Sequence, residues 1–274
     1  MNIRTATLKG VFSEPRLRHA KTDDEFAVNF ADDGVVAELS ARVATVTKKA
    51  AAHASAVDVE SRFPHEAMAA ARAERLLGVA VPRELGGEGV GVADVVDVCY
   101  ALGRVCASTA MIYAMHQTKV ACLVRHGRAS AWHQLLLRRL CAEQLLLASS
   151  TTEGQAGGDV RHSSAAVDGE QRITLEREAT VISYGEAADG IVTTARRASG
   201  AAKSDQVLVA FLKENYTLER VNGWDAFGMR GTCSAGFKLR ASGLREQILP
   251  VSYETIHSHT MMPFAHLVWS GAWA

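Results

Sequence analysis

The sequence predicts an α+β protein of several domains, in the order helical domain, antiparallel β domain and further helix. Apolar residues recur with helical spacing up to about residue 145. From about 147 to 250 they form short runs rich in Val, Ile and Thr, and helical spacing returns after Ser252. We therefore expect domains at 1–146, 147–250 and 251–274.

At least four helical segments are expected in the first domain. Pro64 and Glu66 open an alanine-rich segment that Gly78 ends, because proline is tolerated in the first helical turn and glycine stops a helix. A second segment carries an i, i+3, i+4, i+7 stripe of Val92, Val95, Val96, Cys99 and Leu102. Residues 108–127 form a third, and Ser130 is the expected cap of a fourth. The pattern indicates a helical bundle domain.

The glycine-rich run LGGEGVGVAD, residues 85–94, is predicted to be a loop between two helices. It contains no G-x-G-x-x-G and opens no βαβ unit, so a dinucleotide fold is not indicated.

The second domain is expected to be an antiparallel sheet structure of about a hundred residues. Its apolar runs include TVISYG, GIVTTA and QVLVAFL, and Asp168-Gly169 is a hairpin signal. Ser183 lies in the first of these runs, and we expect a strand there in which its hydroxyl needs a hydrogen-bond partner.

Composition excludes several classes of function. Thirty Lys plus Arg balance thirty Asp plus Glu, which argues against a nucleic-acid-binding protein. No apolar stretch reaches the roughly twenty residues of a membrane-spanning helix, and no export signal is evident, so a soluble cytoplasmic protein is expected. The five cysteines form no CxxC pair and are expected to be mainly buried thiols, and no metal site is indicated.

Four stretches, in order, resemble the acyl-CoA dehydrogenase family of FAD-dependent enzymes. LLGVAVPRELGGEGVG, residues 76–91, resembles a segment between helices of the family's first domain. SSTTEGQAGGDV, residues 149–160, resembles the signature that opens its β domain. VISYGEAAD and WDAFGMRGTCS, residues 181–189 and 224–234, resemble two later β-domain segments.

The resemblance covers residues from about 25 to 274. It implies an N-terminal helical bundle, a middle barrel-like β domain and the first helix of a truncated C-terminal bundle. It implies that Ser149, Thr151 and Thr152 meet the pyrimidine side of the flavin ring. Val181 and Ser183 would lie on the strand that backs the ring, with Ser183 near flavin N5. Gly158 would contact the FAD pyrophosphate or the substrate.

The chain departs from the family pattern at several positions. Gly154 replaces a proline, Gln155 commonly a glycine, and Gly158 a serine. Glu176-Arg177 stands where many members have Asn-Gly, for which a tight turn is expected. Ala179 stands where lysine is frequent.

The last segment, MMPFAHLVWSGAWA, has helical spacing at Met262, Ala265, His266 and Trp269 but no capping residue. The resemblance implies that the carboxylate base of some members would lie at Ala265, and in others beyond residue 274. No catalytic residue is therefore assigned in this chain. His266 is expected to point about 100° away from Ala265.

The resemblance implies α,β-dehydrogenation of an acyl-CoA thioester, as in fatty acid metabolism, with hydride transfer to FAD. An electron-transfer acceptor protein and a homotetramer, or a hetero-oligomer, are the implied partners. Because the base is missing, we expect the isolated chain to be inactive. Two alternatives stay open: a non-catalytic flavin- or acyl-CoA-binding subunit that needs a partner, and a flavin-dependent hydroxylase of related fold.

Overall fold

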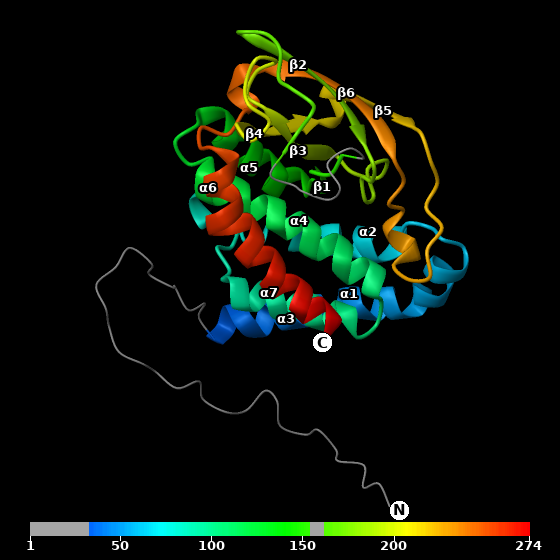
Figure 1. Cartoon of the computed structure of the whole chain (residues 1–274). Helices are drawn as coiled ribbons and strands as arrows, with labels where there is room; N and C mark the ends of the chain where they lie inside the picture. The colour runs from blue at the N-terminus through cyan, green and yellow to red at the C-terminus, as the bar shows by residue number, and fades with distance from the viewer. Residues whose placement is uncertain (1–32, 154–161) are drawn as a thin grey trace, which may run out of the picture.

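The computed structural model describes residues 33–153 and 162–274, with side chains described from Glu38 on. Helices form one layer and two small sheets lie over it, with the C-terminal helix α7 running across the helical layer (Figure 1). This agrees with the predicted α+β order of helices, sheet and further helix. Gly158 lies outside the described residues.

Within residues 33–143, the helical part is built from five α-helices: α1 Asp33–Val59, α2 His65–Ala73, α3 Val92–Gly103, α4 Ala107–His126 and α5 Ala131–Glu143. Pro64 precedes α2 as predicted, but α2 ends at Ala73, and the expected stop Gly78 lies in the short 3-10 helix Leu76–Gly78. The Ser130 hydroxyl accepts from the backbone N–H of His133 at the start of α5, as predicted. The glycine-rich run is a loop up to Gly91, whose N–H donates to Asp94 of α3. The buried stripe of α3 is Val95, Val98, Cys99 and Leu102, while Val92 is exposed.

The strands form two three-stranded sheets, ordered β1-β3-β4 and β2-β6-β5. Their bounds are β1 Leu147–Ser150, β2 Arg172–Ala179, β3 Gly190–Arg196, β4 Gln206–Leu212, β5 Tyr216–Arg220 and β6 Phe237–Leu244. The pairings are antiparallel as predicted, except that β1 lies parallel to β3. A parallel pair needs a long connection, and the 39 residues between Ser150 and Gly190 provide it.

The predicted hairpin is present at Asp168-Gly169. Asp168 pairs with Thr174, and Gly169 has φ 103°, a conformation that favours glycine. The turn expected at Glu176-Arg177 is wrong, because both residues lie inside β2 and pair with Arg240 and Leu239 of β6. Exposed and buried positions alternate along β2, so Glu176 faces solvent and Arg177 faces the interior.

The chain ends in α6 Tyr253–Ile256, a π-helical segment His257–Met261 and α7 Met262–Trp273. The buried face of α7 is Ala265, Val268, Gly271 and Ala272, whereas Trp269 and Trp273 are exposed. One hydrophobic cluster joins α1, α3 and α4 with both sheets and with Val268 and Ala272 of α7. The helices and the sheets therefore share a continuous core.

Four cysteines are buried as expected, and Cys233 is half-buried. Among the described residues, no helix is long and apolar enough to cross a membrane.

Candidate functional site

The hydroxyl-rich segment predicted as a binding loop starts inside β1 and continues beyond it. Ser149 is half-buried in the strand. The backbone of Ser150 is fixed to β3, because its carbonyl accepts a hydrogen bond from the Thr193 hydroxyl at 2.8 Å. Thr151 and Thr152 follow directly and are half-buried. Within the described residues, their hydroxyls make no hydrogen bond.

The start of β1 is fixed by His116 of α4. Its Nδ1 accepts from the Leu147 N–H at 3.0 Å, so in the neutral ring Nε2 carries the hydrogen and donates to the Leu77 carbonyl at 2.9 Å. Burial lowers the pKa of His116 to about 4. The imidazole is therefore a neutral cross-link between the helices and the hydroxyl-bearing strand.

Val181 and Ser183 do not lie in a strand, and that expectation is wrong. β2 ends at Ala179, and residues 183–187 form a turn in which Tyr184 has φ 45°. Two long-range backbone hydrogen bonds hold this turn. The Ile182 N–H donates to the Ala235 carbonyl at 2.9 Å, and the Tyr184 N–H donates to the Thr232 carbonyl at 2.7 Å. The apolar spacing of VISYG resembles a strand, but these partners lie about fifty residues further along the chain.

Ser183 has the hydrogen-bond partner that the sequence required. Its Oγ lies 2.8 Å from Ser234 Oγ, which lies 2.8 Å from Thr232 Oγ1, and Thr232 donates to the Met229 carbonyl at 2.8 Å. Each hydroxyl has a single hydrogen. Because Thr232 donates to Met229, Ser234 must donate to Thr232, and Ser183 must donate to Ser234. Ser183 therefore offers a ligand only lone pairs.

Tyr184 connects the two parts of the site. Its buried hydroxyl donates to the Leu147 carbonyl of β1 at 3.1 Å, so the Ser183 turn is tied to the strand that carries Ser149. Sequence reasoning missed Tyr184, Thr232 and Ser234. The signal for the last two is the hydroxyl pair in GTCS, residues 231–234.

Ala265 is buried on the inner face of α7, and His266 is exposed, as their predicted 100° separation requires. The position at which the resemblance implies a base therefore holds a methyl group.

Residues 37–144 match the family model described as the N-terminal domain of acyl-CoA dehydrogenases. Cyclohex-1-ene-1-carbonyl-CoA dehydrogenase of Geobacter metallireducens is 31% identical over 193 residues, 69% of this chain and 50% of that protein. A probable acyl-CoA dehydrogenase of Mycobacterium leprae is 34% identical over 142 residues, 50% of this chain and 36% of that protein. The chain thus spans at most half the length of these two relatives.

Among solved structures, FMN-bound TdsC of a Paenibacillus species, a dibenzothiophene monooxygenase, superposes with a TM-score of 0.76. The match has 15% identity and covers 86% of this chain and 61% of that chain. This similarity shows a shared fold.

Proposed function

Because the chain belongs to the acyl-CoA dehydrogenase family, we propose that it provides the flavin-binding part of an enzyme that dehydrogenates an acyl-CoA thioester. The substrate class is carried over from the family. The observation that carries the cofactor assignment is the pair of hydroxyls at Thr151 and Thr152, which have no hydrogen-bond partner within the described residues, beside a second hydroxyl group at Ser183. A bound FAD would accept the β-hydrogen as hydride, chemistry that no side chain supplies.

The donor set suits a flavin ring. Ser149, Thr151 and Thr152 offer hydroxyl and backbone groups to the pyrimidine carbonyls, where a reduced flavin concentrates negative charge. Val181, half-buried, covers the ring face. These assignments rest on the family resemblance together with the half-buried position of the two threonines, whose hydroxyls have no hydrogen-bond partner within the described residues. Gly158 remains assigned by resemblance alone.

Ser183 is expected to affect the reduction potential of the bound flavin. As a hydrogen-bond acceptor it suits a ring that carries a hydrogen at N5, which is the reduced form. We therefore expect Ser183 to favour reduction. Substituting Ser234→Ala removes the acceptor of the Ser183 hydrogen and frees Ser183 to donate, so the midpoint potential of the bound flavin should fall.

The reaction also needs a carboxylate base for the α-proton. Ala265 supplies none, so we expect little dehydrogenation by the 274-residue chain. The acceptor at Ser183 also suits a flavin-dependent hydroxylase, the second candidate function, since that reaction starts from reduced flavin. An electron-acceptor protein and a homotetrameric assembly belong to the first proposal.

The first test is the visible spectrum of the purified chain after addition of FAD and removal of the excess. Retained flavin is expected, and its loss would overturn the proposed cofactor role. Anaerobic addition of acyl-CoAs of different chain lengths should leave wild-type flavin oxidised. Ala265→Glu should bleach it, whereas Ala265→Gln, of the same size but without a base, should not.

Equal behaviour of these two variants, both folded and flavin-loaded, would contradict the assignment of position 265 to the base. Oxygen-dependent product formation by wild-type protein with a flavin reductase would favour the hydroxylase.

A further inference from the structure

Arg177 is a charged residue in the interior between the two sheets. Only 1% of it is exposed, and it occupies an inward position of β2. Its Nη1 donates to the carbonyl and to the hydroxyl of Thr194 of β3, the latter at 3.1 Å. The side chain therefore reaches from one sheet to the other. Within the described residues, Nε and Nη2 are buried without a hydrogen-bond partner.

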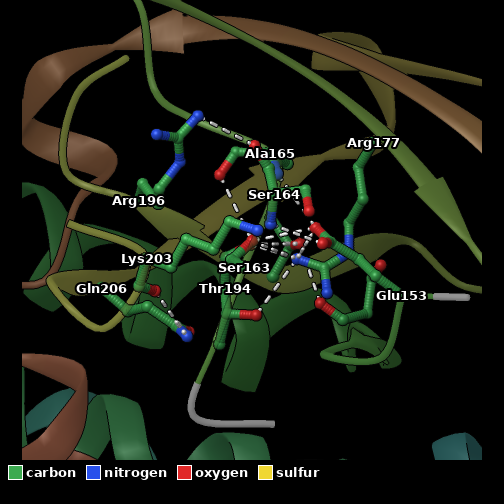
Figure 2. A network of polar contacts seen from close by, with 11 residues as sticks. Glu153, Ser163, Ser164, Ala165, Arg177, Thr194, Arg196, Lys203 and Gln206 are labelled. Atoms are coloured by element: carbon green, nitrogen blue, oxygen red, sulfur yellow. Dashed lines mark hydrogen bonds and ion pairs between the residues drawn. The ribbon is translucent and has the colours of Figure 1, made fainter. Parts of the chain in front are cut away.

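The ion-pair partner of Arg177 is Glu153, the residue that follows Thr151 and Thr152. Arg177 Nη1 lies 3.4 Å from Glu153 Oε1, and the two side chains are 0% and 6% exposed. Figure 2 shows the guanidinium among Glu153, Ser163 and Thr194. The Glu153–Arg177 pair thus links β2 to the segment that continues β1.

The Glu153 carboxylate accepts three further hydrogen bonds, all from residues 163–165. Ser164 N–H donates at 2.5 Å, Ala165 N–H at 3.1 Å and the Ser163 hydroxyl at 2.9 Å. One carboxylate therefore joins residue 153 to residues 163–165. Both sides of this connection lie within the described part of the chain.

Glu153 is ionised in this setting. Burial raises its pKa, but the Arg177 charge and the three donors lower it more, so the pKa of Glu153 lies below its usual value. Burial also lowers the pKa of Arg177, which stays charged because a guanidinium titrates far above neutral pH. The pair is therefore a buried ion pair whose carboxylate also accepts three hydrogen bonds.

Stability alone does not account for such a pair. An apolar pair of similar volume is often as stable or more stable, because removing two charges from water costs more than their attraction returns. What the ion pair does provide is a defined geometry. Thr151 and Thr152 lie between two fixed points: Ser150, bonded to Thr193, and Glu153, bonded to Arg177 and to residues 163–165.

We propose that the Glu153–Arg177 pair is a positioning element that holds Thr151 and Thr152 in the arrangement that receives the flavin. The inference rests on the proposed flavin site and adds the pair as a determinant of its affinity. Holding the two threonines in place before binding removes an ordering cost that the flavin would otherwise have to offset. Arg177 and Glu153 themselves need not touch the cofactor.

The first test needs no flavin. Amide hydrogen exchange of Ser164 and Ala165 is measured in the 274-residue chain and in Arg177→Met. We expect exchange to be roughly tenfold faster or more in the variant, because local opening exposes these amides. Arg197→Met is the matched control, since Arg197 forms an exposed pair with Asp205 at 3.1 Å. Unchanged exchange in Arg177→Met overturns the proposal whether or not flavin binds.

The second test compares FAD affinity and the visible spectrum of the bound flavin. Arg177→Met should weaken binding by roughly tenfold or more and shift the flavin bands, whereas Arg177→Lys should recover part of the affinity. In Glu153→Gln/Arg177→Met no charge is left buried alone, so thermal stability should return towards wild type while binding stays weak. This separates positioning from a purely structural role, in which stability and affinity would recover together.

Wild-type affinity and spectrum in a folded Arg177→Met overturn the positioning role and leave the proposed function intact. Absence of flavin from wild type overturns the proposed function, and the exchange measurement then still decides whether the pair holds the two segments.

Discussion

The backbone of Gly103 in α3 lies directly against Ala272 in α7, so that a Cβ on Gly103 would overlap the Ala272 carbonyl oxygen. A second close approach involves the neighbouring residue of α7, because a Cβ on Gly271 would lie 2.8 Å from Val96 of α3. The segment WSGAW, residues 269–273, therefore belongs to a helix that packs closely on α3 through its small residues. Two glycines allow this packing.

Gly103→Ala and Gly271→Ala should destabilise the protein by about 1–3 kcal/mol, because the added methyl groups overpack the α3–α7 contact. In an isolated helix the same change would stabilise by about 1 kcal/mol, so the sign of the effect identifies the contact. Urea unfolding measures it. Gly200→Ala, with open space around its Cβ, is the control and should be neutral. A stabilising effect at Gly103 would contradict this packing.

Stability should fall in mild acid because of His116. Its pKa is lowered from 6.5 to about 4 by burial, so between these values the unfolded chain binds the proton more readily. The neutral His116 ring contributes on the order of a few kcal/mol to the free energy of unfolding. This contribution is complete above pH 6.5 and is lost as the pH falls through about 4. Urea unfolding at several pH values should show this slope.

His116→Gln should be less stable at pH 7 but should show a weaker dependence on pH. Burial also lowers the pKa of His133 to about 4. His133 therefore adds to the pH dependence of stability in the same pH range, and part of this dependence will remain in His116→Gln. An unchanged slope in His116→Gln would rule out His116 as its source.

Lys119 should destabilise the protein at neutral pH. It is buried in α4, its Nζ lies 3.7 Å from the Met261 sulfur, and burial lowers its pKa from 10.5 to about 8. Between pH 8 and 10.5 the unfolded chain binds more protons, so stability should rise with pH there. Lys119→Met should raise stability at pH 7 by a few kcal/mol and remove this rise. Lys49→Met, on the exposed side of α1, is the control and should do neither.

The exposed face of α7 should promote self-association. Met262, Leu267, Trp269 and Trp273 are 41%, 50%, 40% and 69% exposed, and exposed large apolar side chains on one short helix favour association. The double variant Leu267→Lys/Trp273→Gln should have a lower weight-average mass by sedimentation equilibrium at a given concentration. Its melting temperature should stay within a few degrees of wild type. If the double variant unfolds instead, these side chains contribute to the fold of the chain itself.

Local patterns were sufficient to predict much of the fold. The Ser130 cap, the Asp168-Gly169 hairpin and the helical spacing of the last segment depend on residues within a few positions of each other, and each is present. The Ser183 strand and the Glu176-Arg177 turn failed because their conformations depend on distant partners. Ser183 is held in a turn by residues 232–235, and Arg177 continues β2 because β6 pairs with it along its length.

The sequence by itself determined the order of helices and strands, the hydroxyl-rich segment after β1 and the family to which the chain belongs. Only the tertiary structure decided the direction of the hydrogen bonds from Ser183 to Met229 and the pairing of Arg177 with Glu153. The physical reason is the separation along the chain between the residues that interact. Helical spacing and caps come from neighbours within one or two turns, whereas a buried hydroxyl or guanidinium takes its state from partners that only folding brings near.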